Sequence, residues 1–245
     1  MVDTDKKLSA QNEWVDNDEV FPMKNSYGAV FDLDGVLLDS ESDLTWLYTA
    51  LEKTLEHLGI ESSEENLMKI HSKNVHRFNE ISIELGIEAE DLWETRNREY
   101  IEEKIMAMKN GMIKPFSDVD CLYELKGRYG LSIVSNSPQE IVDLFIEEFN
   151  YEDLFDCGIG RGASLVDLKK IKPNSYLLER LKERIQEENL IYIGNSENDR
   201  KFSKNTGMEF MFLSRGGAKR EEFDTLDKIV KCLLKSPTTK TGKSN

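Results

Sequence analysis

The sequence predicts an α/β protein with a doubly wound, Rossmann-like parallel-sheet core and a small α-helical domain inserted into it. Three observations support this fold class. Short apolar runs, typical of strands buried on both faces, lie at residues 27–31, 131–135 and 190–193. Amphipathic segments separate the later runs, as in sheets wound from alternating strands and helices. Residues 42–113 show helical spacing and no strand pattern.

The first predicted strand, at residues 27–31, ends in two acidic residues, Asp32 and Asp34, separated by one position. Side chains at positions i and i+2 of an extended chain point to the same side. We therefore expect both carboxylates in the crevice at the carboxyl end of the strand, where open α/β sheets bind their ligands. Gly35 permits the tight turn that follows.

The helical insert begins near residue 42. The spacing of Ser40 and Asp43 predicts a capping box at its first helix. Leucines recur at helical spacing after this point, and Gly59 ends the helix. Further amphipathic pieces span residues 64–72, 74–85 and 89–109.

Strands and helices alternate again after the insert. The strand at 131–135 ends in Ser135 and Asn136, and a helix begins near Gln139. A hydroxyl and an amide beside a helix N-terminus are suited to bind a phosphate, although such turns are also common where no ligand binds. The other predicted helices span 118–129, 175–186 and 226–234, and the other predicted strands span 155–159 and 209–213.

Two more polar segments occur in this second half. Lys172-Pro173 precedes the helix at 175–186, and we interpret the neighbouring Lys169 and Lys170 as solvent-exposed. The strand at 190–193 ends in the segment Gly-Asn-Ser-Glu-Asn-Asp at 194–199.

In this order, four segments resemble the four motifs of the haloacid dehalogenase-like (HAD) phosphohydrolases, in the subgroup of phosphoglycolate phosphatase and β-phosphoglucomutase. The segments are 32–40, Ser135 with its neighbours, Lys172-Pro173 and 194–199. The resemblance covers roughly residues 27–235. It implies a core at 26–41 and 114–235 and a helical cap domain at 42–113 that closes over the site. We expect the lead-in at 1–25 to be disordered and the tail at 236–245 to be flexible.

The resemblance also implies a role for each candidate residue. Asp32 would be the nucleophile that becomes an aspartyl-phosphate, and Asp34 the general acid and base. Ser135, the Asn136 backbone and Lys172 would bind the phosphoryl group, with Lys172 neutralising charges that otherwise repel. The implied Mg²⁺ ligands are Asp32, the Asp34 backbone carbonyl, Asn195 and Asp199.

The fourth segment departs from the family pattern GDxxxD. Asp199 stands where the second acid belongs, but Asn195 replaces the first. An amide offers a neutral oxygen in place of a carboxylate, so the site loses one negative charge for a cation that prefers carboxylate and water oxygens. The sequence therefore predicts a weakened Mg²⁺ site.

The expected activity is Mg²⁺-dependent hydrolysis of a small phosphomonoester, such as phosphoglycolate, a sugar phosphate or a nucleotide monophosphate. Asp34 favours phosphoryl transfer, because a dehalogenase has no use for an acid that protonates an alkoxide leaving group. Two alternatives stay open. A β-phosphoglucomutase-like enzyme would return the phosphoryl group to its substrate, and a non-catalytic binding protein would keep the fold without the metal site.

Composition limits the partners and the location. The net charge of −15, without a dense lysine or arginine cluster, argues against nucleic acid as a partner. The three cysteines are widely spaced and fit neither a disulfide framework nor a CxxC metal site. No stretch approaches 18 apolar residues, and the start lacks an apolar signal region. We expect a cytoplasmic monomer or homodimer that binds a small phosphorylated metabolite and no membrane.

Overall fold

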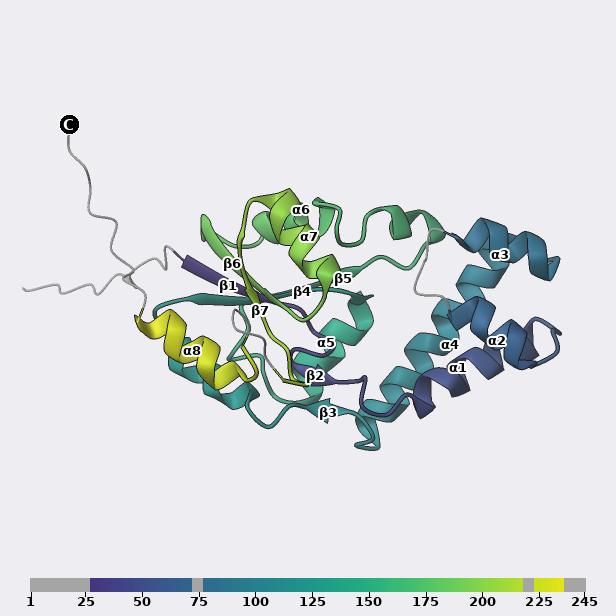
Figure 1. The fold of residues 1–245 in the computed structure, drawn as a ribbon, viewed down its shortest axis with the longest axis horizontal. Helices are drawn as coiled ribbons and strands as arrows, with labels where there is room; N and C mark the ends of the chain where they lie inside the picture. Colours follow the sequence, from purple (N-terminus) through teal and green to yellow (C-terminus); the bar gives the residue numbers. More distant parts are fainter. Residues whose placement is uncertain (1–26, 72–76, 218–222, 236–245) are drawn as a thin grey trace, which may run out of the picture.

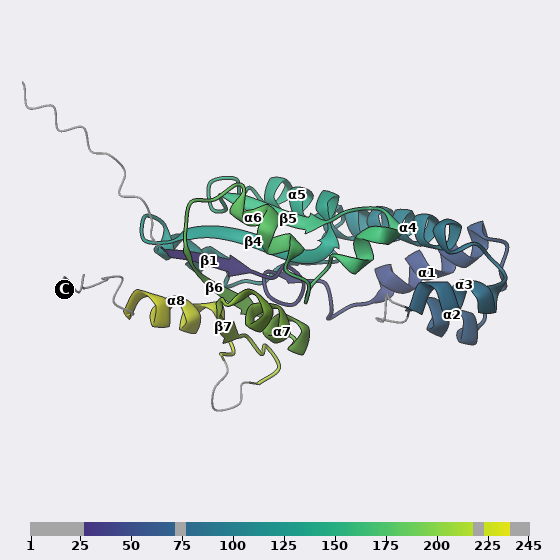
Figure 2. The ribbon, with the colours of Figure 1, turned by 90° about the horizontal axis from the view of Figure 1, so that it is seen from above.

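The computed structural model describes residues 27–71, 77–217 and 223–235, and its core is a five-stranded parallel sheet (Figure 1). The strands are β1 (Tyr27–Phe31), β4 (Gly130–Pro138), β5 (Cys157–Arg161), β6 (Asn189–Gly194) and β7 (Glu209–Phe212), in the spatial order β5-β4-β1-β6-β7. The central strand is therefore β1, which Asp32 follows directly. Figure 2 views this sheet face-on.

Helices cover both faces of the sheet. In Figure 1, α6 (Tyr176–Lys182) and α7 (Glu197–Thr206) lie above it, and α5 (Gln139–Glu148) and α8 (Leu226–Lys235) lie below it. Two 3₁₀ helices, η2 (Val119–Leu125) and η3 (Leu165–Lys169), complete the connections. The prediction of a doubly wound α/β fold is confirmed.

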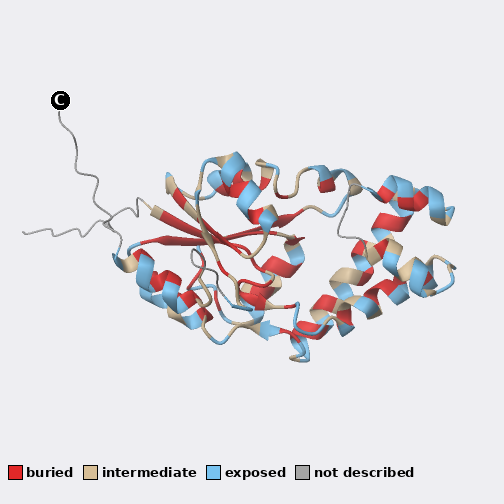
Figure 3. Ribbon diagram, in the orientation of Figure 1, coloured by how far each residue is buried: buried red, intermediate tan, exposed pale blue. Residues whose placement is uncertain are grey.

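Alternating side chains along β1 build two hydrophobic layers. Ala29 and Phe31 pack with the apolar residues of η2, α5 and α8, whereas Val30 packs with those of α6 and with Phe202 of α7. Successive strand residues point to opposite faces, and here both faces are covered. Figure 3 shows the resulting burial along the central strands. This explains why the strands appear in the sequence as continuous apolar runs.

Four helices lie beyond the carboxyl ends of the strands (Figure 1). They are α1 (Thr45–His57), α2 (Glu64–His71), α3 (Phe78–Leu85) and α4 (Ala89–Lys109). Their apolar faces form a third cluster that includes Leu51, Leu55 and Trp93. The chain enters and leaves this group through a two-stranded antiparallel ribbon, β2 (Leu38–Asp39) with β3 (Lys114–Pro115). The division into core and cap at residues 42 and 113 stays a prediction.

The predicted capping box of Ser40 and Asp43 is wrong. The residue preceding α1 is Leu44, which makes no side-chain cap. The Ser40 hydroxyl instead donates to Asp34 Oδ1 at 2.6 Å, while Asp43 accepts from the Thr45 N–H at 2.9 Å. Ser40 is buried, so a hydrogen bond to a carboxylate satisfies a hydroxyl that could not reach water.

Other boundaries differ from the predictions for local reasons. The helix expected at 118–129 is the shorter 3₁₀ helix η2, whose fully buried residues Val119, Leu122 and Leu125 follow its three-residue period. The helix expected at 175–186 ends at Lys182, and the strand expected at 155–159 lies two residues later. The predicted lead-in and tail fall outside the described residues. Among the residues that the structure describes, no helix is long and apolar enough to cross a membrane.

Candidate active site

Asp32 lies at the carboxyl end of β1, in contact with Lys172. The Lys172 ammonium is 2.8 Å from Asp32 Oδ1 and 2.6 Å from Asp199 Oδ1, and it donates to the Tyr192 hydroxyl at 2.7 Å. All four side chains are buried. The first and third segments singled out in the sequence therefore meet, with one cation between two carboxylates.

Burial sets the electrostatics of this group. It raises the pKa of Asp32 to about 7, and the charge of Asp199 acts in the same direction, while Lys172 opposes them. Burial also disfavours the charge of Lys172, but the two carboxylates outweigh it and raise the pKa of Lys172. The lysine thus stays charged, whereas the negative charge at Asp32 is only partly compensated.

Asp199 has partners that the sequence interpretation did not assign. Its Oδ1 accepts from Lys172 and, at 3.3 Å, from the Tyr192 hydroxyl. Its Oδ2 accepts from the Ser196 hydroxyl at 2.5 Å and the Ser196 N–H at 3.1 Å, which forms a capping box at the start of α7. Both oxygens are therefore engaged in holding Lys172 and the helix. The spacing Ser-x-x-Asp was the signal that could have revealed this role.

Asp34 is paired with Lys104 of α4, a residue that sequence reasoning missed. The ammonium lies 2.5 Å from Asp34 Oδ1 and also donates to Ser137 Oγ at 3.0 Å and to the Tyr100 hydroxyl at 3.2 Å. Ser137 in turn donates to Asp34 Oδ2 at 2.6 Å. Burial would raise the pKa of Asp34, but Lys104 and the hydroxyl donors outweigh it and lower the pKa.

The sequence contained a weak signal for Lys104. It follows two glutamates in a highly charged helix, so it resembles a residue on a solvated face. Trp93, Asn97, Tyr100 and Lys104 nevertheless share one helical face, because they are four, three and four positions apart. That face meets the core, and Lys104 is fully buried there.

Replacing Lys104 by methionine is expected to lower the free energy of unfolding. Breaking a buried ion pair costs about 3–5 kcal/mol, and because the Asp34 side chain is 23% exposed we expect about 2–3 kcal/mol. Urea denaturation of Lys104→Met measures this change. Lys109→Met, at the exposed end of the same helix, is the matched control. A loss no larger than that of the control would contradict the ion pair.

Ser135 and Asn136 lie on β4 beside β1. Ser135 is buried, and its hydroxyl accepts from the Ser137 N–H at 3.1 Å. The Asn136 side chain brackets the Lys172 backbone, accepting from its N–H at 2.8 Å and donating to its carbonyl at 3.3 Å. Asn198 donates to the same carbonyl at 2.9 Å. Two amides thus fix the position of Lys172, and of Asn136 only the backbone remains for a phosphate.

Asn195 lies against the turn that follows Asp34. Its Nδ2 is 2.0 Å from the position that a Cβ would take at Gly35, whose φ is +73°. Both facts make a larger residue strained there and favour glycine. The fourth segment therefore contacts the first. Within the described ranges, no three histidines, cysteines or acids are placed to hold a metal ion. A cation here would depend on Asp32, the Asn195 amide and main-chain oxygen.

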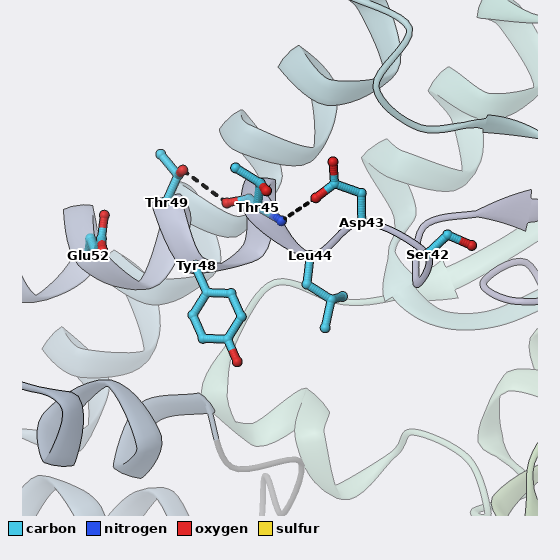
Figure 4. A pocket seen from close by; sticks show the side chains of 7 residues that line it. All are labelled: Ser42, Asp43, Leu44, Thr45, Tyr48, Thr49 and Glu52. Carbon is cyan, nitrogen blue, oxygen red and sulfur yellow. Dashed lines mark hydrogen bonds between the residues drawn. The ribbon is translucent and has the colours of Figure 1, made fainter.

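A shallow pocket lies at the start of α1 (Figure 4). It is lined by Ser42, Asp43, Leu44, Thr45, Tyr48, Thr49 and Glu52, and contains none of the candidate site residues. Asp43 and Glu52 make it a poor site for a phosphate dianion, because like charges repel. We therefore keep the site at the ends of β1, β4 and β6.

The sequence model of the haloacid dehalogenase-like hydrolase family matches residues 29–213 of this chain. The chain belongs to this family. It is 29% identical, over 183 residues, to the phosphoglycolate phosphatase of Aquifex aeolicus (strain VF5), a match that covers 73% of this chain and 80% of the relative. The resemblance inferred from the four segments is confirmed.

Solved HAD structures share the fold. A HAD phosphatase from Thermococcus onnurineus is 22% identical with a TM-score of 0.57, and the match covers 84% of this chain and 97% of that one. CbbY from Rhodobacter sphaeroides is 16% identical with a TM-score of 0.59, covering 83% and 96%. The predicted enzyme class, a HAD-like hydrolase, is confirmed, and the relatives agree with a phosphoric monoester hydrolase.

Proposed function

We propose that this HAD hydrolase is a Mg²⁺-dependent phosphatase that acts on a small phosphomonoester through an aspartyl-phosphate. The observation that carries the proposal is the Lys172 ammonium 2.8 Å from Asp32 at the end of the central strand, with Ser135 on the neighbouring strand. A carboxylate and a cation so placed suit attack on a phosphoryl group. The phosphoglycolate phosphatase among the relatives supports phosphoglycolate or a similar compound as the substrate. We also propose a cytoplasmic location, as expected from the sequence.

The proposed reaction has two steps. An Asp32 oxygen attacks phosphorus, and the bond to the ester oxygen breaks. The lowered pKa of Asp34 keeps it ionised at rest, so Asp34 takes up a proton from solvent before it passes one to the departing alcohol. Asp34 then takes a proton from water, whose oxygen attacks the aspartyl-phosphate and releases phosphate. Lys172 and the Ser135 hydroxyl stabilise the phosphoryl oxygens throughout, because such transfers depend mainly on positioning and electrostatics.

The residues present fit a magnesium ion. Mg²⁺ is held in proteins by one or two carboxylates, by waters and by substrate phosphate. Asp32, the Asp34 carbonyl and the Asn195 amide would hold it. Burial and the charge of Asp199 disfavour the ionised form of Asp32, and a cation would offset both. When bound, the ion supplies positive charge to the phosphoryl oxygens. Asp199 is left out of this set, because both its oxygens are engaged elsewhere.

Asn195→Asp is expected to tighten Mg²⁺ binding by roughly 5- to 30-fold. A charge pair at 4 Å and an effective dielectric near 20 is worth about 4 kcal/mol, of which about 1–2 remain after desolvation. A magnesium titration of activity measures the half-saturation concentration. Asn150→Asp, which adds the same charge at an exposed position after α5, should leave it unchanged. Equal half-saturation in the Asn195→Asp and unsubstituted enzymes would show that position 195 is not at the metal.

Hydrolysis of an aryl phosphate, with magnesium and with a chelator, tests the proposed function directly. We expect hydrolysis that depends on the metal. Its rate should be higher on one or more phosphorylated metabolites than on the aryl phosphate. The mutase alternative predicts that turnover requires a bisphosphate activator. The binding-protein alternative predicts no hydrolysis under any of these conditions, and that result would overturn the proposal.

A further inference from the structure

Arg161, the last residue of β5, is a buried cation that forms no salt bridge with a described residue. Its side chain donates to Asn97 Oδ1 at 2.6 Å and to the Gly162 carbonyl at 3.0 Å, and its guanidinium lies over the Trp93 ring at 4.8 Å. These acceptors are neutral. In the part of the chain that the structure describes, Arg161 makes no ion pair, although it is only 6% exposed.

This arrangement is costly unless an anion completes it. Burial lowers the pKa of Arg161 to about 10, and the charge of Arg96 adds to the effect. Tyr100, Glu140 and Asp167 act in the opposite direction without outweighing burial. Arg96 is also held by a neutral group, the Ile70 carbonyl at 3.0 Å. A guanidinium has five N–H donors, of which Arg161 uses two in these bonds. Buried charges in proteins are usually paired, so an unpaired one points to a ligand.

Two elements connect Arg161 with the candidate catalytic carboxylate Asp34. In the pairing of β4 with β5 it is opposite Pro138, the residue after Ser137, whose hydroxyl donates to Asp34. Helix α4 contacts both Arg161 and Asp34. Asn97 contacts Arg161, and seven residues later, about 10 Å along the helix, Lys104 contacts Asp34. The tyrosine between them, Tyr100, contributes to the electrostatics of both cations.

We infer that Arg161 forms a second anion subsite, which binds a carboxylate on the organic part of the substrate. The planar guanidinium presents paired N–H groups that match the two oxygens of a carboxylate. Asn97, Gly162 and Trp93 hold it in place and leave its other donors for the ligand. The inference rests on the proposed phosphatase function and names its substrate class, phosphomonoesters that carry a carboxylate.

Two matched substrate pairs test the subsite. They are 2-phosphoglycolate with 2-hydroxyethyl phosphate, and 3-phosphoglycerate with glycerol 3-phosphate. In each pair the first compound carries a carboxylate where the second carries a neutral alcohol. We expect the carboxylate member to have the higher kcat/KM in one or both pairs. Arg161→Gln should lower that kcat/KM about 10- to 100-fold, mainly through KM, as for the loss of hydrogen bonds to a charged group. The neutral member should change less than about twofold.

Two further variants separate binding from structure. Arg161→Lys keeps the charge but loses the planar fork, so we expect a smaller loss, and it replaces Arg161→Gln if that variant does not fold. Arg180→Gln is the matched control, because Arg180 donates from α6 to the Gly160 carbonyl of the same strand, at 3.0 Å. It should leave the carboxylate preference intact. Equal losses on both members of a pair, or no carboxylate preference in either pair, would overturn the subsite.

A measurement without turnover distinguishes failure of the subsite from failure of the proposed function. The carboxylate compounds are titrated calorimetrically into the Asp32→Asn protein, with and without Arg161→Gln. Binding that is lost with Arg161→Gln, while the unsubstituted enzyme hydrolyses neither the four compounds nor an aryl phosphate, supports the subsite and rejects the phosphatase. Hydrolysis with no dependence on Arg161 in either assay rejects the subsite and leaves the phosphatase.

Discussion

Asp32→Asn is expected to reduce phosphatase activity by roughly 10⁴-fold or more, as for the loss of other catalytic nucleophiles. The amide has the shape of the carboxylate but lacks the charged oxygen that attacks phosphorus. The contact with Lys172 changes from an ion pair to a hydrogen bond, and Lys172 keeps its second carboxylate, Asp199. The fold should therefore remain intact. Steady-state hydrolysis of an aryl phosphate and thermal unfolding measure the two effects.

The matched control is Asp39→Asn, in the ribbon strand that follows the same turn. The Asp39 side chain accepts from the Ser42 N–H at 3.3 Å and touches none of the candidate catalytic groups. Activity within about twofold of the unsubstituted enzyme is expected. Near-normal activity of Asp32→Asn would show that no aspartyl-phosphate forms at this position, and the covalent mechanism would be abandoned.

Lys172→Met is expected to lower both stability and activity. It leaves Asp32 and Asp199 as two buried carboxylates without a cation, and breaking a buried pair in this way costs about 3–5 kcal/mol. The loss of charge stabilisation at the phosphoryl group should lower kcat by roughly 10²- to 10³-fold. Urea denaturation and initial rates measure the two changes separately.

A second substitution tells the two roles of Lys172 apart. Adding Asp199→Asn to Lys172→Met removes one of the repelling carboxylates, so stability should partly return while activity stays low. Lys169→Met, three residues earlier and exposed, is the control and should change neither quantity. Full recovery of activity in the double variant would mean that Lys172 acts only on stability and not on the phosphoryl group.

The fold class follows from the sequence because burial on both faces is a local requirement with a local signature. Each central strand of the sheet carries an apolar run, and each run is followed by a helix with one apolar face. The pairing order could not be obtained in the same way. The two neighbours of β1 in the sheet, β4 and β6, begin about 100 and 160 residues further along the chain. No local pattern encodes that separation.

The candidate site also has one part that local sequence patterns predict and one part that they do not. Asp32, Asp34, Ser135 and Lys172 could be named from the sequence, because each stands at the end of a strand or the start of a helix, in a segment that resembles a family motif. Their neighbours come from elsewhere. Lys104 and Asn97 belong to a helix whose composition resembles a solvated face, and Arg161 ends a short strand without a distinctive motif.

Only the tertiary structure brings these cations to the edge of the sheet where Asp32 lies. A buried charge is tolerated when its partner is fixed beside it, and that partner is supplied by a different element in each case. Asp34 finds its cation on α4, and Lys172 finds its second carboxylate on α7. The sequence indicated which groups are candidates for the chemistry. The packing of distant helices against the central strand decided which charges meet, because electrostatic partners are chosen by distance in space.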